Sequence, residues 1–160
     1  KGKTTAATGL CLRAAGHGWQ IGFVQFLKDG SSGEIAALSR ISGVRVFPFL
    51  SPIKFVFAMS DAEKAQARLF YDHLWQEILS AVPDLDLLVL DEIFGAIETG
   101  MVEEGQLKDL LLHKPAGLEL VLTGRHPTAA TAQSADYLME IRSHRHPYDK
   151  GVSAREGIEW

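Results

Sequence analysis

Hydrophobic positions along the chain fall into two alternating patterns. Short, nearly continuous apolar runs alternate with longer stretches in which apolar residues recur every three or four positions. The first pattern is typical of strands buried on both faces of a parallel sheet, and the second of amphipathic helices. Their alternation predicts an α/β protein with a mostly parallel central sheet flanked by helices. The predicted strands are residues 20–27, 44–49, 85–90, 118–123 and 137–142.

The helical stretches carry recognisable start and stop signals. The longest begins at Ser60, which forms a capping-box pattern with Glu63, and its apolar stripe continues until Pro83. No internal repeat or linker interrupts the alternation, so we expect a single domain over residues 1–160. The longest irregular stretch is residues 50–59. The other predicted helices are residues 4–15, 34–41, 103–112 and 127–133.

The chain opens with the second half of a phosphate-binding loop, Lys1-Gly2-Lys3-Thr4-Thr5. In such a P-loop the glycine lets backbone N–H groups surround phosphates, the lysine reaches the β- and γ-phosphates, and the hydroxyl binds Mg²⁺. The start of the following helix favours the same anion. The alternative is a short disordered remnant. We expect a nucleoside triphosphate site, with one more strand and the first half of the loop preceding residue 1. The expected P-loop NTPase-like sheet then has about six strands.

A second nucleotide signal is the apolar run at 85–90 followed by Asp91 and Glu92, which is a Walker B pattern. A buried parallel strand delivers Asp91 to its carboxyl end, the edge of the sheet where ligands bind. The alternative is that both acids merely begin the next helix. Together with the P-loop residues, the pattern favours a nucleotide site in which Thr4 and Asp91 hold Mg²⁺.

Two further segments have candidate binding residues. Thr123-Gly124-Arg125 ends another apolar strand, so Arg125 either reaches a phosphate at the same edge or is a solvated arginine after a turn. The segment 47–57 holds four phenylalanines, which either fill the core or line an apolar pocket for a second ligand. Composition alone favours the core.

Bulk composition excludes several classes of protein. With 160 residues, 46% of them hydrophobic, the chain has ordinary globular composition, and its net charge of −4 argues against a nucleic-acid partner. The single Cys11 excludes a disulfide framework and favours a reducing compartment. No apolar run is long enough to span a membrane and no signal peptide is visible, so we expect a cytoplasmic location. The scattered histidines show no metal-site spacing, and no side-chain nucleophile is supported by local sequence.

In these motifs the chain closely resembles the P-loop ATP:corrinoid adenosyltransferases over nearly its whole length. A generic P-loop protein would share only the phosphate loop and the Walker B strand. Further motifs carry the resemblance: Arg13-Ala14-Ala15-Gly16-His17-Gly18, Val24-Gln25-Phe26-Leu27-Lys28, Thr123-Gly124-Arg125, Ala135-Asp136, His146-Pro147-Tyr148 and Gly151-Val152-Ser153-Ala154-Arg155-Glu156-Gly157-Ile158-Glu159.

The resemblance implies transfer of the 5′-deoxyadenosyl group of MgATP to the Co(I) centre of a corrinoid, with release of triphosphate, in adenosylcobalamin biosynthesis or salvage. The protein then positions and stabilises charge rather than supplying a nucleophile. Lys3 and Arg125 are the implied catalytic residues. The implied ATP-binding residues are Lys1, Gly2, Lys3, Thr4, Thr5 and Arg125. The resemblance also implies that Mg²⁺ is bound by Thr4, Asp91 and Glu92.

The resemblance also assigns Phe55 and Phe57 to the corrinoid, where they pack against it and displace its lower axial ligand. Phe57 stands where relatives usually carry Trp. A homodimer and a flavoprotein reductase as electron donor are implied as well. Two alternatives stay open: a P-loop ATPase or small-molecule kinase, and a non-enzymatic nucleotide-gated corrinoid carrier.

Overall fold

A parallel sheet lies at the centre of the molecule. The structure, a computed structural model, describes residues 1–52 and 54–159. Within these residues a single sheet has the strand order β2-β1-β3-β4, and all three pairings are parallel. The prediction of an α/β protein with a parallel sheet is therefore confirmed. The strands are β1 (Ile21–Gln25), β2 (Val44–Val46), β3 (Leu87–Asp91) and β4 (Glu119–Leu122).

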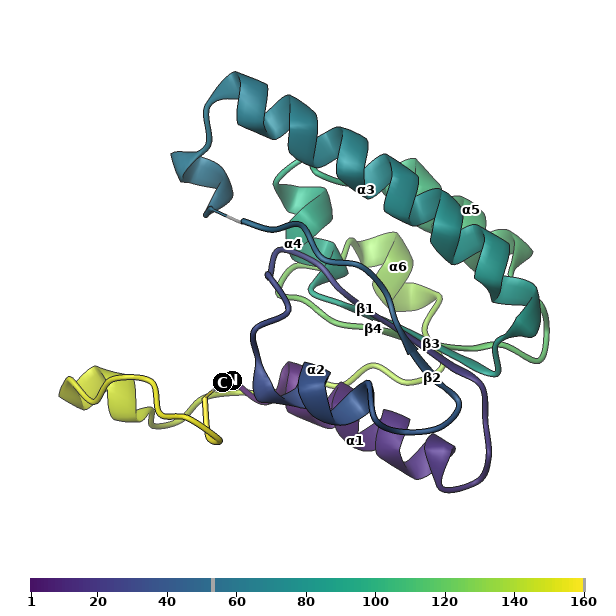
Figure 1. The fold of residues 1–160 in the computed structure, drawn as a ribbon, viewed down its shortest axis with the longest axis horizontal. Helices are drawn as coiled ribbons and strands as arrows, with labels where there is room; N and C mark the ends of the chain where they lie inside the picture. Colours follow the sequence, from purple (N-terminus) through teal and green to yellow (C-terminus); the bar gives the residue numbers. More distant parts are fainter. Residues whose placement is uncertain (53, 160) are drawn as a thin grey trace.

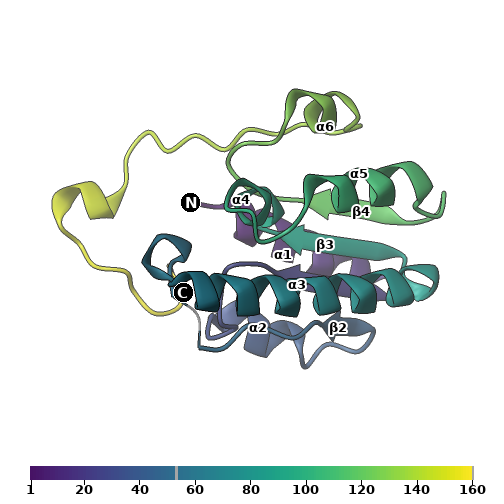
Figure 2. The same cartoon turned by 90° about the horizontal axis from the view of Figure 1, so that it is seen from above.

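Helices cover both faces of the sheet (Figure 1). Helices α1 and α2 lie on one face, and α3, α4, α5 and α6 lie on the other. The view from above shows the chain after α6 running out beyond one end of the sheet (Figure 2). The helices are α1 (Lys3–Ala15), α2 (Gly33–Leu38), α3 (Asp61–Ala81), α4 (Ile93–Glu98), α5 (Glu104–His113) and α6 (Ala129–Gln133), with 3₁₀ turns η1 (Val56–Ala58), η2 (Val82–Asp84) and η3 (Pro147–Lys150).

The two faces of the sheet bury separate apolar clusters. Alternate residues of β1 and β3, among them Phe23 and Val89, pack with α1 and α2. The residues between them, such as Val24 and Leu90, pack with α3, α4 and α5. Burial on both faces explains why the two strands read as continuous apolar runs. Successive side chains of a strand point to opposite faces of the sheet. The position of a residue along the strand therefore also determines toward which face the last side chain of each strand points.

The predicted strand at 137–142 is wrong, as is the count of about six strands. The structure shows no regular element there, and Tyr137, Leu138 and Met139 are largely exposed. A strand needs a neighbour whose backbone accepts its hydrogen bonds. Among the described residues, none pairs with this segment, and the strand expected before residue 1 lies outside the sequence. An apolar pattern alone therefore overestimated the sheet.

Most predicted boundaries hold within a few residues. The capping box at α3 is present: Ser60 Oγ accepts from the Glu63 N–H at 3.3 Å, and Glu63 Oε2 accepts from the Ser60 N–H at 2.8 Å. Strand β2 ends at Val46, earlier than predicted. Helix α4 was not among the predicted helices and corresponds only to the alternative in which Asp91 and Glu92 begin a helix. No described helix combines the length and apolar character needed to cross a membrane.

Candidate functional site

The predicted phosphate-binding residues form the start of α1. Gly2 has a φ of 104°, in the left-handed region that favours glycine, and α1 begins at the next residue, Lys3. The first amides of a helix have no partner within the helix, so this turn presents N–H donors and the positive end of the helix dipole. Helix α1 packs against β3 and β1, which brings its first turn to the carboxyl ends of these strands. The predicted P-loop residues therefore lie at the expected edge.

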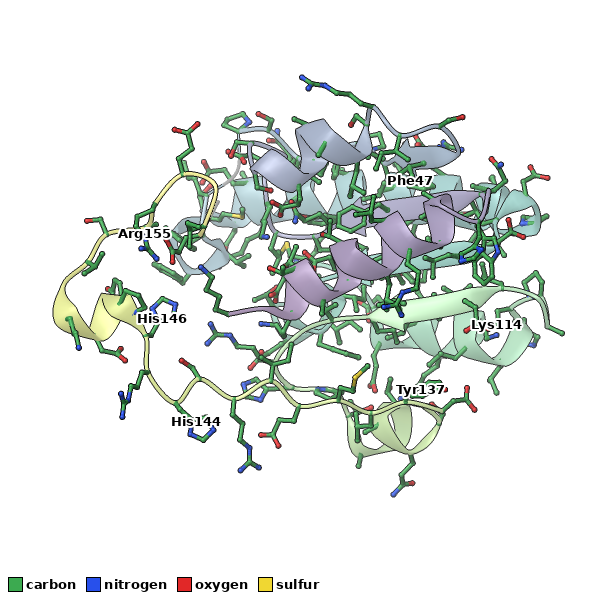
Figure 3. All side chains as sticks on the ribbon, turned by 90° about the horizontal axis from the view of Figure 1, so that it is seen from below. Phe47, Lys114, Tyr137, His144, His146 and Arg155 are labelled. Atoms are coloured by element: carbon green, nitrogen blue, oxygen red, sulfur yellow. The ribbon has the colours of Figure 1, made fainter. Side chains whose placement is uncertain are left out.

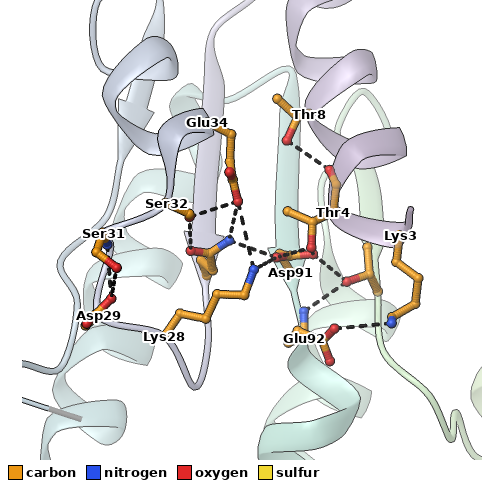
Figure 4. A network of polar contacts seen from close by, with 12 residues as sticks. Lys3, Thr4, Thr8, Lys28, Asp29, Ser31, Ser32, Glu34, Asp91 and Glu92 are labelled. Atoms are coloured by element: carbon orange, nitrogen blue, oxygen red, sulfur yellow. Dashed lines mark hydrogen bonds and ion pairs between the residues drawn. The ribbon is translucent and has the colours of Figure 1, made fainter. Parts of the chain in front are cut away.

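Asp91 is the centre of a polar network at this edge (Figure 4). It is the last residue of β3 and is completely buried. Thr4 Oγ1 lies 3.0 Å from both of its carboxylate oxygens, and Thr123 Oγ1 donates to Oδ1 at 2.7 Å. Gln25, its partner in register on β1, donates from Nε2 to Oδ2 at 3.1 Å. A buried carboxylate must be matched by such donors, and here three elements supply them.

Lys3 and Glu92 form the second pair of the site. Lys3 Nζ lies 3.3 Å from Glu92 Oε1, and both side chains are about one quarter exposed. Glu92 has a φ of 60°, unusual for a residue other than glycine, and its N–H donates to Thr123 Oγ1 at 2.9 Å. It is also the N-cap of α4. The interpretation of the two acids as the start of a helix is thus correct for Glu92, while Asp91 ends the strand.

The oxygen atoms of Asp91 and its neighbour Thr4 are of the kind that bind Mg²⁺. Thr4 and Asp91 supply hard oxygen atoms side by side, and Mg²⁺ prefers one or two carboxylates together with substrate phosphates over a dedicated protein cage. In the described part of the chain, no group of three or more His, Cys, Asp or Glu side chains is arranged to hold a metal ion. The chemistry of the site thus matches a metal that arrives with a nucleotide.

The remaining predicted nucleotide residues lie at the same edge without joining the network. Lys1 Nζ pairs with Glu159 Oε1 at 2.7 Å and donates to the Ile158 carbonyl at 2.7 Å. Thr5 is exposed on the first turn of α1. Arg125 is exposed, two residues after Thr123. The structure therefore brings Lys3, Thr4, Asp91 and Glu92 together and leaves Lys1 paired with the end of the chain.

Gly124 allows the turn before Arg125 to pass close to α4. Its φ is 157°, and a Cβ at this position would lie 2.5 Å from the Cβ of Phe94. Real Cβ atoms do not approach other atoms so closely, so only glycine fits between β4 and α4. Thr123 can then face Asp91 while Arg125 stands clear of the sheet.

The phenylalanine-rich segment divides between the two interpretations. Phe47 is buried in the apolar cluster on the α3 face of the sheet, and Phe49 packs against the cluster on the α1 face. In contrast, Phe55 and Phe57 are 77% and 87% exposed. The two exposed rings stack with centroids 5.4 Å apart and planes inclined by 11°. Residue 53 of this segment lies outside the described residues. Figures 1 and 2 place η1 beyond the same end of the sheet as the start of α1. The expectation from composition that these phenylalanines fill the core is therefore wrong for Phe55 and Phe57.

The exposed rings are tethered to α3 through Glu63. Lys54 Nζ contacts Glu63 Oε1 at 2.5 Å, and the same carboxylate closes the capping box with Ser60. Hydrogen bonds from Lys54 and from the Ser60 backbone lower the pKa of Glu63 from its ordinary 4.5 to about 2. One carboxylate therefore joins the helix start to the residue before Phe55.

We expect the stability of the protein to depend on this carboxylate at low pH. A pKa that is lower in the folded state contributes stability above 4.5, and this contribution is lost as pH falls from 4.5 to about 2. Glu63→Gln keeps an acceptor for the Ser60 N–H but loses the charge. Its urea midpoint should therefore fall less steeply over this range than that of the wild type. Glu77→Gln on the same helix is the control, and identical slopes for Glu63→Gln and wild type would contradict the prediction.

Sequence reasoning missed several members of the network around Asp91. Gln25 bridges Asp91 and Glu34, with Nε2 3.2 Å from Glu34 Oε1, and Ser32 Oγ donates to the same Glu34 oxygen at 2.9 Å. Lys28 Nζ lies 3.9 Å from both Glu34 and Asp91. A glutamine at the end of a buried apolar strand was the available signal, because such a polar group needs a partner.

The C-terminal segment lies mostly outside the folded body. Figure 3 shows Tyr137, His144 and His146 along an extended stretch that leaves the sheet. Arg155 lies where the chain turns back toward the folded body. Arg155 binds the Glu159 carboxylate through Nε and Nη2, both at 3.1 Å. The segment thus ends beside Lys1, at the same edge as the site (Figure 1).

A broad cleft of about 990 Å³ lies at the opposite edge of the sheet. It is lined by residues at the amino ends of the strands and on α3, among them Gln20, Val44 and Glu77. None of the predicted site residues lines it. Ligands of parallel sheets bind at the carboxyl ends of the strands, so we place the functional site at the edge of Asp91 rather than in this cleft.

The protein is an α/β protein with a P-loop-like fold. Three features define this class: the parallel sheet, the lysine and threonine at the start of α1, and the buried aspartate at the end of β3. The chain matches over residues 1–160 the family model described as ATP:corrinoid adenosyltransferase BtuR/CobO/CobP. The chain therefore belongs to this family of transferases.

Curated relatives agree with the family match. The corrinoid adenosyltransferase of Pseudomonas aeruginosa is 30% identical over 162 residues, which cover the whole chain and 79% of that protein. The corrinoid adenosyltransferase CobA of Salmonella typhimurium is 30% identical, and a corrinoid adenosyltransferase of Escherichia coli is 29% identical. Both alignments cover the whole chain and 81% of the relative.

Proposed function

We propose that the protein transfers the 5′-deoxyadenosyl group of MgATP to the Co(I) centre of a corrinoid and releases triphosphate. One observation carries the proposal: Thr4 lies 3.0 Å from the buried Asp91, beside Lys3, in a chain that belongs to the corrinoid adenosyltransferases. The site is built to hold phosphates and a metal at one end of a nucleotide. The ribose end then remains available for reaction.

The proposed reaction needs no nucleophile from the protein. The Co(I) electron pair forms the bond to the 5′-carbon while the bond from this carbon to oxygen breaks, and triphosphate leaves with that electron pair. The one cysteine supports this assignment: Cys11 is buried, and burial raises the pKa of its thiol to about 12. Such a thiol is protonated at neutral pH and is a poor nucleophile.

The residues at the start of α1 would stabilise the leaving group. Backbone N–H groups after Gly2 and the ammonium of Lys3 face the charge that develops on the triphosphate, and Arg125 adds a guanidinium from the end of β4. Lys1 and Thr5 complete the phosphate contacts. Bound by Thr4, Asp91 and Glu92, Mg²⁺ would neutralise part of the phosphate charge.

Phe55 and Phe57 would form the corrinoid contact. A stacked pair that is largely exposed offers a flat apolar surface, which suits a large planar ligand. Contact on the lower face of the corrinoid would displace its axial ligand and make Co(II) easier to reduce. The tether from Lys54 to Glu63 would hold the pair in place.

We expect Phe57→Ala to impair turnover more with Co(II) substrate under a mild reductant than with preformed Co(I). The loss with Co(II) should be on the order of tenfold, because an aromatic contact that assists reduction is removed. Leu112→Ala is the matched control, since Leu112 is also largely exposed, on α5. Equal losses with the two substrates would indicate that Phe57 only contributes to packing.

Analysis of the products tests the proposed function. The protein is incubated without oxygen with ATP, Mg²⁺ and chemically reduced corrinoid, and absorbance is recorded before and after illumination. Adenosyl transfer yields a photolabile Co–C bond and intact triphosphate. Accumulation of ADP without a photolabile product would identify an ATPase or kinase. Spectral change on corrinoid binding without either product would identify a carrier.

We also propose a homodimer that receives electrons from a flavoprotein reductase. The exposed row Tyr137, Leu138 and Met139 supports an interaction surface, because contiguous apolar residues at the surface often mark contacts with a partner. Sedimentation velocity measures the oligomeric state directly. A monomer at micromolar concentration would contradict this part of the proposal.

A further inference from the structure

The loop that follows β1 is held in an unusual conformation. Leu27 has a φ of 57°, although it is not glycine, and its N–H donates to the Tyr71 hydroxyl at 3.1 Å. Tyr71 is buried in α3, and its ring lies 5.6 Å from that of Phe26. Backbone strain of this kind persists only where surrounding contacts impose it. The loop is therefore fixed, and it determines where the next residue, Lys28, stands.

Lys28 is directed to the carboxylates at the edge of the sheet. Its ammonium lies 3.9 Å from Asp91 Oδ2 and 3.9 Å from Glu34 Oε1, and its side chain is 38% exposed. Figure 4 shows Lys28 and Lys3 on opposite sides of Asp91. The first comes from the loop after β1 and the second from α1. Two lysines from separate elements thus flank the position where Thr4 meets Asp91.

The two carboxylates do not depend on Lys28 for hydrogen bonds. Asp91 already accepts from Thr4, Thr123 and Gln25, and Glu34 accepts from Gln25 and Ser32. In the part of the chain that the structure describes, Lys28 Nζ makes no closer polar contact than these two at 3.9 Å. An ammonium has three donors, so this one retains its capacity to bind an anion.

We propose that Lys28 is a second phosphate-binding lysine, which contacts the triphosphate from the β1 side while Lys3 contacts it from α1. The identity of the anion rests on the proposed function. A polyanion at the end of α1 would draw Lys28 away from its long contacts with Glu34 and Asp91, because direct charge-assisted hydrogen bonds are stronger than ion pairs at 3.9 Å. Gln25 and Ser32 would continue to hold the two carboxylates.

The alternative role is structural, with Lys28 as the counterion of Glu34 and Asp91. Removal of a counterion would lower the stability of the folded protein without changing its affinity for an anion. Removal of a phosphate contact would lower the affinity for triphosphate and leave the affinity for adenosine unchanged. Binding measurements with the two halves of ATP therefore separate the roles.

Calorimetric titration with inorganic triphosphate in the presence of Mg²⁺ tests the inference. We expect Lys28→Met to raise the dissociation constant by about tenfold, as for loss of one charged hydrogen bond, and Lys28→Arg to restore most of the affinity. Lys108→Met is the control, because Lys108 is a half-exposed lysine paired with Glu104 at 3.1 Å on α5. Unchanged affinity of Lys28→Met for triphosphate, or an equal loss for adenosine, would overturn the inference.

A second measurement uses the wild-type chain and does not depend on the folding of a variant. Lysines are acylated with a water-soluble reagent with and without Mg²⁺ and inorganic triphosphate, and modification is quantified by mass spectrometry. Triphosphate should reduce acylation of Lys28 and Lys3 but not of Lys108. Equal acylation of Lys28 under both conditions would overturn the inference.

The outcome is separable from that of the proposed function. If triphosphate protects Lys28 and Lys28→Met binds it weakly, the inference holds even where no photolabile product forms. If adenosyl transfer occurs and Lys28→Met binds triphosphate normally, only the inference fails. If triphosphate does not bind the wild type at all, the inference fails, and the analysis of products still decides the proposed function.

Discussion

Lys3→Ala should reduce adenosyl transfer by on the order of 10²-fold or more, with the protein still folded. Removal of one preorganised charge at a developing anion typically has this effect on rate. The fold should survive, because the ion pair between Lys3 and Glu92 is partly exposed and such pairs contribute about 0–1 kcal/mol. The measurement is the initial rate of formation of the photolabile product, together with the thermal midpoint.

Lys108→Ala provides the control for Lys3→Ala. It removes the same side chain from an exposed face of α5, where Lys108 pairs with Glu104. Its rate should equal that of the wild type. If Lys3→Ala also retains the wild-type rate, Lys3 has no part in the site.

Asp91→Asn should have an effect of similar size on Mg²⁺-dependent turnover. The carboxylate is fully buried and accepts from Thr4, Thr123 and Gln25, whereas an amide has only one acceptor oxygen and turns its NH₂ toward a donor. We expect a destabilisation of about 1–3 kcal/mol from the mismatched donor, in addition to the loss of the negative charge near the metal. Urea unfolding and the rate as a function of Mg²⁺ concentration measure the two effects.

Asp86→Asn separates a site effect from a general effect on β3. Asp86 lies just before β3 and accepts from the Gln20 N–H at 2.7 Å, at the opposite edge of the sheet from Asp91. This variant should keep the wild-type dependence on Mg²⁺. If Asp91→Asn shows the same dependence as the wild type, Asp91 does not interact with the metal.

The sequence was sufficient to predict the fold class because the burial of a strand determines which of its residues are apolar. Strands β1 and β3 are buried on both faces and therefore appear as continuous apolar runs, and the capping box at Ser60 is a local signal. The failure at residues 137–142 has the opposite cause. A strand depends on a neighbour that is distant in sequence, and no local pattern records whether that neighbour is present.

The candidate site was predictable to the extent that its residues follow known motifs. Lys3, Thr4 and Asp91 lie together as their motifs predict. Gln25 lies in a segment that carries the family resemblance but had no predicted role, and Glu34 belongs to none of the motifs. Both residues join the network through strand register and a loop. The exposure of Phe55 and Phe57 was also unpredictable from composition, because identical residues fill the core at Phe47 and leave it a few positions later.

The pairing of Gln25 with Asp91 in register has a consequence for the genetics of the protein. The two polar residues are the last rung of a ladder whose earlier rungs include Phe23 paired with Val89, on the α1 face. Substitutions that displace apolar pairs such as Phe23 and Val89 would therefore also move Gln25 and Asp91 out of alignment. A mutational screen that scores activity would then recover inactivating changes down this face of the sheet, at positions that never touch a ligand.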